Sequence, residues 1–355
     1  MLRRRRLGAL GLVLGILGLA LGLGLSTGGG GRGSPVRTPG AARGSALASS
    51  APATIRATLA SWRLPTPLSR AGLVTLPNGT LLLVGGLDGQ GGSTAALRQV
   101  DPASGTVRTV GQLAQATHDA ATALVGHEVL VLGGGQVTST ALVQGVPLSG
   151  SAPGGPAALL GELPTARSDS EAVVVGGQAL VAGGWDGTSG TGAVLATTDG
   201  TSFRTLAQLP HPVRYPALAV VGHTLWVLGG LAASNGASGQ PVATIQRVDL
   251  ATGQASLAGD LPEPLTGAAA VDLAGHLLLV GGRTATGDST AVFGLVPQGG
   301  SATDPRTLLA RPVGQLAQGV AHAAVGVVGH TAWVLGGETA GTPVATVQAL
   351  RLTAS

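Results

Sequence analysis

The sequence predicts an all-β fold made of six similar units of four antiparallel strands, because two marks recur in fixed register along the chain. One mark is a glycine pair that closes an apolar run, as in LLLVGG and WVLGG, and the other is a leucine followed by proline or alanine. Each leucine precedes its glycine pair by 20 or 21 residues, and successive pairs are 46 to 55 residues apart. The glycine pairs begin at Gly85, Gly133, Gly183, Gly229, Gly281 and Gly336, and the leucines are Leu64, Leu113, Leu163, Leu209, Leu261 and Leu316.

The elements of one unit follow from the residues between the marks. An apolar run such as AVVV or LAVV, a turn of two or three residues and a second apolar run that ends at the glycine pair predict a β-hairpin. A variable polar loop, a third strand such as ATIQRVDL and a fourth strand that leads to the leucine complete the unit. Six such units predict a β-propeller over residues 54–355.

The order of the marks predicts how the ring closes. The first leucine mark comes before the first glycine pair, and nothing follows the last third strand, ATVQALRL. We therefore expect the N-terminal strand within Thr54–Leu64 to complete the unit begun by residues 320–352, which hides the sheet edges.

Composition excludes several classes of protein. Of the 355 residues 44% are hydrophobic and 10% are charged, and the 61 glycines follow no three-residue period, so neither a disordered nor a collagen-like chain is expected. The absence of cysteine excludes disulfides, thiolate metal sites and thiol nucleophiles. All 20 basic residues are arginine, and seven lie in the first fifty positions, which leaves 13 arginines against 16 acidic residues. This mildly acidic remainder offers no basic stripe for nucleic acid.

The N-terminus predicts a membrane anchor. Residues 1–6 are basic, and the uncharged residues 7–25 would span roughly 28 Å as a helix, close to the thickness of a bilayer core. This length favours an uncleaved single-pass anchor with the propeller outside the cell membrane, and cleavage near Ser26 or Gly28 would instead give a secreted protein. Residues 26–53, rich in Gly, Ser, Pro and Arg, are expected to be a flexible linker.

The glycine pairs, the variable loops and the turns bearing Asp resemble the Kelch repeat across roughly residues 54–355. The resemblance implies a six-bladed Kelch-type β-propeller, preceded here by the hydrophobic helix. Kelch units usually carry Tyr in the third strand and Trp in the fourth, whereas this chain has one Tyr, and only Trp62 lies in a fourth strand. Functions tied to those aromatic residues therefore do not transfer.

The family that this chain resembles includes two kinds of enzyme. Copper radical oxidases resembling galactose oxidase need a Tyr crosslinked to Cys, which a chain without Cys lacks. The sialic acid mutarotase type needs acid–base groups near an anionic sugar, and His118, Asp119, Arg167 and Arg214 are residues of the required kinds.

Four histidines, His127, His223, His276 and His330, occupy the turn between the first and second strands of their units. Because these positions lie on separate blades, we interpret them as turn residues and expect no metal site and no other cofactor.

The opposite face carries the candidate ligand-binding residues. Loops that enter the first strand and loops that leave the second strand share one face, where their polar groups would converge at the channel mouth. In Kelch proteins that this chain resembles, binding arginines often sit just before the first strand, which corresponds to Arg70, Arg167 and Arg214. Trp185 follows a glycine pair within a polar loop, where it is expected either to stack on a ligand or to cover the neighbouring blade. The candidates are Arg70, His118, Asp119, Arg167, Asp169, Trp185, Asp186, Arg214, Tyr215, Arg283, His322 and Glu338.

We therefore expect a membrane-tethered, monomeric binding module for a cell-envelope protein or a glycan. The alternative is a sugar-active enzyme resembling sialic acid mutarotase.

Overall fold

The computed structural model describes residues 54–233, 239–301 and 304–353, and every helix or strand assigned in these ranges is a β-strand. In the same ranges no helix is long and apolar enough to cross a membrane. The expected anchor at residues 7–25 and the linker at 26–53 lie outside the described residues.

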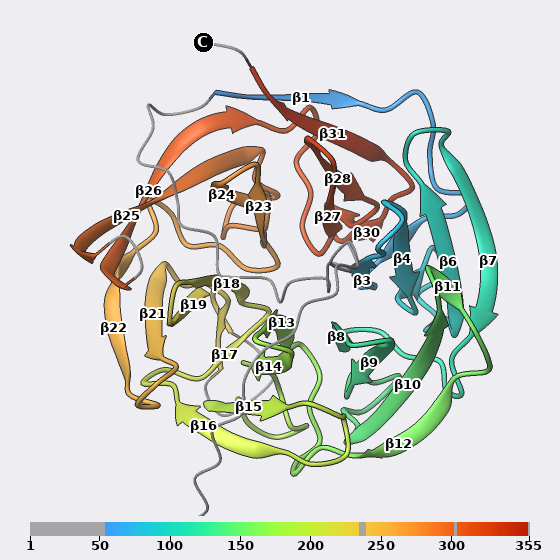
Figure 1. Ribbon diagram of the computed structural model, residues 1–355. Coiled ribbons are helices and arrows are strands. Elements are labelled where there is room, and N and C mark those ends of the chain that lie inside the picture. Colours follow the sequence, from blue (N-terminus) through green and yellow to red (C-terminus); the bar gives the residue numbers. More distant parts are fainter. Residues whose placement is uncertain (1–53, 234–238, 302–303, 354–355) are drawn as a thin grey trace, which may run out of the picture. The chain divides into compact units, whose positions relative to one another are not determined.

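The strands form four-stranded antiparallel sheets, each assembled in chain order (Figure 1). In each sheet two short strands make a hairpin, and a third and a fourth strand add outward from it. Four sheets follow this plan: β3 (Gly72–Thr75), β4 (Leu81–Val84), β6 (Ala96–Asp101) and β7 (Thr106–Gln112); β8 (Ala121–Val125), β9 (Glu128–Leu132), β10 (Leu142–Ser149) and β12 (Ala158–Glu162), with β11 (Ala152–Pro153) also on β10; β13 (Glu171–Val175), β14 (Gln178–Ala182), β15 (Ala193–Thr197) and β16 (Arg204–Gln208); and β18 (Ala217–Val221), β19 (Thr224–Leu228), β21 (Thr244–Asp249) and β22 (Ala255–Asp260).

The remaining long strands form one eight-stranded sheet that joins the two ends of the chain. Its order is β23–β24–β25–β26–β1–β31–β28–β27, and its middle contact is a short parallel pairing of Ile55 and Arg56 with Gly314 and Gln315. The N-terminal β1 also pairs antiparallel with the C-terminal β31, from Ile55 opposite Leu352 to Leu59 opposite Gln348, as the order of the sequence marks predicts. The strands are β23 (Ala269–Leu273), β24 (His276–Val280), β25 (Ala291–Ser301), β26 (Asp304–Gln315), β1 (Ile55–Leu59), β31 (Val347–Leu352), β28 (Thr331–Leu335) and β27 (Ala324–Val328).

The innermost strands close a ring. β3, β8, β13, β18, β23 and β27 each contact the next in this order, and β27 contacts β3 again (Figure 1). The hydrophobic core lies between neighbouring sheets: Trp226 of β19, for example, shares a cluster with Leu279 of β24 and Phe293 of β25. The chain therefore has several similar interfaces between sheets in place of one central core.

The glycine pairs hold adjacent sheets together. The N–H of the second glycine donates to a main-chain carbonyl at the entrance of the next unit, as from Gly134 to Arg167 at 2.7 Å, and the last such bond returns from Gly337 to Leu68 at 2.8 Å. A Cβ on the first glycine would meet that same carbonyl oxygen, at 2.1 Å for Gly133 and Arg167. The first glycine also has a positive φ, 69° at Gly133, so both space and backbone conformation select glycine there.

Candidate functional site

A closed ring of main-chain hydrogen bonds lies where the chain enters the innermost strands. In each unit one residue donates its N–H to the carbonyl oxygen of the equivalent residue in the preceding unit, over 2.7 to 3.1 Å. The sixth bond, from Arg70 to His322, closes the ring at 3.0 Å. Its members, here called the entry ring, are Arg70, Asp119, Asp169, Tyr215, Gly267 and His322.

All six residues of the entry ring have a left-handed backbone. Their φ angles run from 50° at Tyr215 to 61° at Gly267, and five of the six are not glycine. A non-glycine residue in this region costs of order 1 to 3 kcal/mol and persists only where its surroundings fix it. Here the ring of hydrogen bonds supplies that constraint, and it turns the side chains of separate units toward one axis.

The loops that leave the second strands lie beside the entry ring. In every unit the residue before the ring residue bridges to the residue after the glycine pair, as Ser168 does with Trp185 and Thr266 with Arg283. In two units the same contact extends into paired two-residue strands. These are β2 (Leu68–Ser69) with β5 (Leu87–Asp88) and β17 (Val213–Arg214) with β20 (Leu231–Ala232), while β29 (Glu338–Thr339) pairs with β30 (Thr342–Pro343) within one leaving loop. Side chains from the two kinds of loop are thereby brought together.

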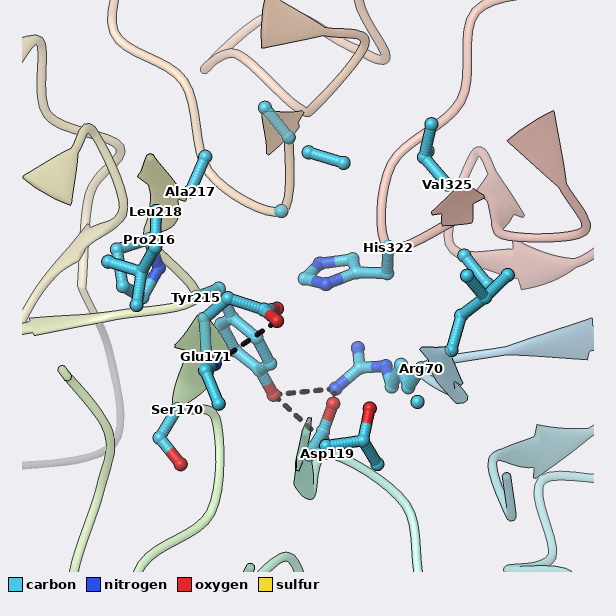
Figure 2. A pocket seen from close by; sticks show the side chains of 18 of the residues that line it. Arg70, Asp119, Ser170, Glu171, Tyr215, Pro216, Ala217, Leu218, His322 and Val325 are labelled. Carbon is cyan, nitrogen blue, oxygen red and sulfur yellow. Dashed lines mark hydrogen bonds and ion pairs between the residues drawn. The ribbon is translucent and has the colours of Figure 1, made fainter. Parts of the chain in front are cut away.

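Arg70 joins side chains from several units. Its Nε donates to Glu338 at 2.5 Å, and its Nη1 donates to Asp119 at 3.1 Å and to the hydroxyl of Tyr215 at 2.7 Å. The Tyr215 hydroxyl in turn donates to Asp119 at 3.0 Å (Figure 2). Arg283 extends the network, because it pairs with Glu338 at 3.3 Å and with Asp288 at 2.7 Å.

A second network surrounds Arg214. Its guanidinium holds one carboxylate oxygen of Asp169 at 2.5 Å and lies 4.9 Å from the centre of the Trp185 ring and 5.5 Å from that of Tyr215. Both geometries are typical of cation–π contacts. The indole of Trp185 is 9% exposed and is stacked by Arg214, so it covers the neighbouring unit while it lines the site.

Burial controls the protonation of the entry ring. It raises the pKa of Asp119 to about 7, although Arg70 acts in the opposite sense. Burial, aided by the positive charge of Arg70, lowers the pKa of His322 to about 3, so this imidazole is neutral at physiological pH. At Glu338 burial opposes ionisation, but the hydrogen bond from Arg70 and the charges around it hold the pKa below its usual value.

Two cavities lie on either side of the entry ring. The mouth pocket, about 290 Å³, lies on the loop side and is lined by Arg70, His118, Asp119, residues 135–139, Ser168, Asp169, Trp185, Gly187, Arg214 and Tyr215. The axial cavity, about 240 Å³, lies on the strand side and is lined by the ring itself and by the first residues of the innermost strands. Figure 2 shows the axial cavity, with Glu171, Tyr215 and His322 projecting into it.

The structure places most of the candidate residues from the sequence in or beside the two cavities. Seven of them line the mouth pocket: Arg70, His118, Asp119, Asp169, Trp185, Arg214 and Tyr215. Glu338 forms ion pairs with both Arg70 and Arg283, and His322 lines the axial cavity. Asp186 accepts the N–H groups of Thr188 and Ser189 at 2.7 Å each and so fixes the turn of its own loop.

Arg167 corrects an expectation from the sequence. It is fully buried, and its guanidinium donates to the carbonyl of Ala193 at 2.9 Å and to the hydroxyl of Thr191 at 3.2 Å, away from both cavities. Arg70, Arg167 and Arg214 do not occupy one equivalent position: Arg70 is in the entry ring, Arg214 is one residue before it and Arg167 two residues before. Residues at the position of Arg167 point inward beneath the glycine pair, so this side chain cannot reach a ligand at the mouth.

Sequence reasoning missed Glu171 and Asp288. Glu171 lies two residues after the ring residue Asp169, where the other units have Gly or Ala. That contrast is the signal that an alignment of the repeats offers. Asp288 gave no comparable signal, because it lies in a variable loop and is recognised only by its contact with Arg283.

The turn histidines are separated from the entry ring by the first strand of their units. His127, His223 and His330 sit between the first and second strands, and His276 begins β24. Throughout the described residues, no group of three or more His, Asp or Glu side chains is arranged to hold a metal ion.

The fold and the entry ring define a β-propeller with a polar pocket at its loop face. No family model matches the chain, and no curated protein matches it significantly. Many solved structures have a similar fold, among them the structure of YjhT, with a TM-score of 0.62 and 15% sequence identity over 81% of this chain and 96% of that one. At this identity the likeness establishes the fold and carries no inference about activity.

Proposed function

We propose that residues 54–355 form a six-bladed Kelch-type propeller that binds one sugar unit of a glycan in the mouth pocket. Dividing the eight-stranded sheet at its short parallel contact gives six four-stranded units, in agreement with the six glycine pairs. The observation that carries the function is the mouth pocket. Its volume, about 290 Å³, is close to the lower end for small-molecule sites, and convergent polar groups line it.

The pocket has the chemistry that recognises hydroxyl-rich ligands. Ser139 and Ser168 present hydroxyls 2.9 Å apart, and His118 is held by Ser93 through a hydrogen bond of 2.8 Å. The cationic Arg214 and the edge of Trp185 complete the wall. Because the entry ring fixes these groups before any ligand arrives, binding requires little further ordering of the protein.

The test is calorimetric titration of the purified full chain with a panel of neutral and acidic monosaccharides and short glycans. We expect saturable binding of at least one sugar, reduced about tenfold or more by His118→Ala or Ser168→Ala, since each removes a hydrogen-bonding group from the pocket. His127→Ala is the matched control, because His127 lies at the other end of β8. A panel without binding, combined with capture of a cell-envelope protein at the same face, would replace the glycan by a protein partner.

A second candidate function, a sugar-active enzyme resembling the mutarotase type, is favoured by Asp119. Burial raises the pKa of this carboxyl to about 7, and it lies between Arg70, Tyr215 and His118. Opening the ring of a reducing sugar needs a group that donates and accepts protons near neutral pH. If the protein is such an enzyme, it should accelerate the exchange of sugar anomers measured by NMR, and Asp119→Asn should abolish this acceleration. Equal exchange rates with and without the protein would refute the enzymatic function and leave only the proposed sugar binding.

We also propose that residues 7–25 tether the propeller to the membrane, on the strength of their uncharged run after Arg3–Arg6. Fractionation of cells expressing the full chain, or a chain that starts after residue 25, tests this proposal. The full chain is expected in the membrane fraction and the shortened chain outside it. Full-length chain recovered only in the soluble fraction would refute the anchor.

A further inference from the structure

The axial cavity contains a carboxylate without an ionic partner. Glu171 is the first residue of β13, and its side chain points toward the propeller axis (Figure 2). Within the described part of the chain Glu171 forms no ion pair, and its hydrogen bond is to the N–H of the adjacent Ala172 at 3.2 Å. The other charged groups that line the cavity are occupied: Arg70 by Asp119 and Glu338, and Asp169 by Arg214.

The environment of Glu171 is unfavourable for an isolated negative charge. Water reaches much of its side chain through the cavity, yet protein surrounds the cavity, and this burial raises the pKa of Glu171 to about 7. Nothing in the packing requires a carboxylate there, since Gly72, Ala121, Ala217, Ala269 and Ala324 occupy the same position in the other units. One unit therefore places a carboxylate at a position that is Gly or Ala in every other unit.

One further group in the same cavity is available to a ligand. His322 projects into the cavity as a neutral imidazole. Gly267 makes room for that ring, because a Cβ there would lie 2.6 Å from its nearest atom. The remaining wall is largely alanine, including Ala71, Ala120, Ala268 and Ala323.

We propose that the axial cavity binds a small alkylammonium compound, with its ammonium group at Glu171 and its alkyl chain against the alanine wall. A charged amine supplies the cation that Glu171 lacks, and its N–H groups suit the neighbouring polar atoms. A metal ion fits less well, because the described residues include no cluster of three ligands. At about 240 Å³ the cavity has room for a small ligand such as propylammonium. The site lies across the entry ring from the mouth pocket and does not depend on the proposed glycan function.

Calorimetric titration of the purified full chain with propylammonium chloride tests the proposal. We expect saturable binding with a Kd of about 1 mM, as a four-heavy-atom ligand allows. Glu171→Gln should weaken the binding at least about tenfold. Glu162→Gln, which removes a carboxylate of β12 outside the cavity, should leave it unchanged. His118→Ala should also leave it unchanged, which separates this site from the mouth pocket.

A second variant keeps the charge and removes the space. Ala269→Leu places a large side chain at the position equivalent to Glu171 in another unit, and we expect it to block propylammonium while the protein still melts cooperatively. Three results would each overturn the proposal: no saturation with propylammonium, equal affinity in Glu171→Gln, or equally strong binding of 1-propanol or potassium chloride. No saturation would mean that Glu171 is hydrated and has no ligand of this kind. Equally strong binding of 1-propanol would show that the charge of the ligand is not recognised, and equally strong binding of potassium chloride would show that the alkyl chain is not recognised.

Discussion

Arg70 and Glu338 are separated by 268 residues and joined by a hydrogen bond of 2.5 Å between Nε and Oε1. Glu338 is 2% exposed, so this contact links the first and the last glycine-pair units through a buried charge. The same arginine holds Asp119 and the hydroxyl of Tyr215, which belong to two other units. One side chain thus connects four units at the point where the ring of sheets closes.

Arg70→Met is expected to destabilise the protein by about 2 to 4 kcal/mol, because it removes the arginine partner of the buried Asp119 and leaves the buried Glu338 with Arg283 alone. The free energy of unfolding in urea gives this value. A double-mutant cycle with Glu338→Gln should show a coupling energy of about 1 to 3 kcal/mol. Additive effects of the two substitutions would mean that the pair contributes nothing beyond its separate members.

Arg167→Met is expected to change stability by less than about 1 kcal/mol, since a buried ion replaced by an apolar side chain of similar size is often neutral or stabilising. Burial already lowers the pKa of Arg167 to about 10, which shows that the folded state disfavours its charge. The two arginine variants are compared under identical denaturant conditions. A loss above about 2 kcal/mol for Arg167→Met would show that its bonds to Ala193 and Thr191 outweigh the cost of burying the charge.

Gly133→Ala is expected to cost at least about 2 kcal/mol more than Gly126→Ala. Both glycines have a left-handed backbone, with φ of 69° and 59°, so the conformational cost is similar. A Cβ at Gly133 meets the carbonyl oxygen of Arg167 at 2.1 Å, whereas a Cβ at Gly126 has nothing within 4 Å. The difference between the melting temperatures of the two variants measures the effect of the close contact between Gly133 and Arg167. Equal melting temperatures would show that this contact does not require glycine.

Glu171→Gln is expected to remove one component of the pH dependence of stability. Burial raises the pKa of Glu171 from 4.5 to about 7, so between these values the folded protein holds a proton that the unfolded chain has lost. Wild-type stability should therefore fall as pH rises from about 4.5 to about 7, by about 1 kcal/mol after screening by cavity water. The variant lacks this fall and is the more stable form above pH 7.

The comparison must be made as a difference between the two proteins. Asp119 also lines the axial cavity and shifts in the same direction, and the other titratable groups facing Glu171 across it are Arg70, Asp169, Tyr215 and His322. Subtracting the pH profile of Glu171→Gln from that of the wild type leaves the contribution of Glu171. A flat difference between pH 4.5 and 7 would mean that Glu171 titrates normally.

The repeat register predicts the fold well because it reflects contacts that every unit makes. The glycine pairs mark where one sheet approaches the next, and Gly133 shows that both space and backbone require them. The N-terminal strand is placed correctly because only one unit lacks its fourth strand in the sequence. The sequence points to Asp119, Asp169 and Tyr215 as candidates because they lie just before a first strand, where the entering loops of all units share one face.

The direction of a side chain in the entering loops depends on how many residues it lies before or after the entry-ring residue of its unit. The sequence alone did not align the units to that precision. At the position of Arg167 the other units have Leu68, Thr117, Val213, Leu265 and Val320, a largely apolar set that indicates burial. At the position of Glu171 they have only Gly or Ala, which indicates an exceptional residue. Contacts within the variable loops, such as that of Arg283 with Asp288, depend on irregular backbone that no repeat pattern encodes.

The pairing of β1 with β31 also has a consequence for biosynthesis. Residues 55–59 leave the ribosome before any other strand of the propeller, yet their antiparallel partner, residues 348–352, is made after all the other strands described. The earlier units can fold as they emerge, while this short strand has no antiparallel partner. The ring of sheets therefore closes late, through the first strand that was made.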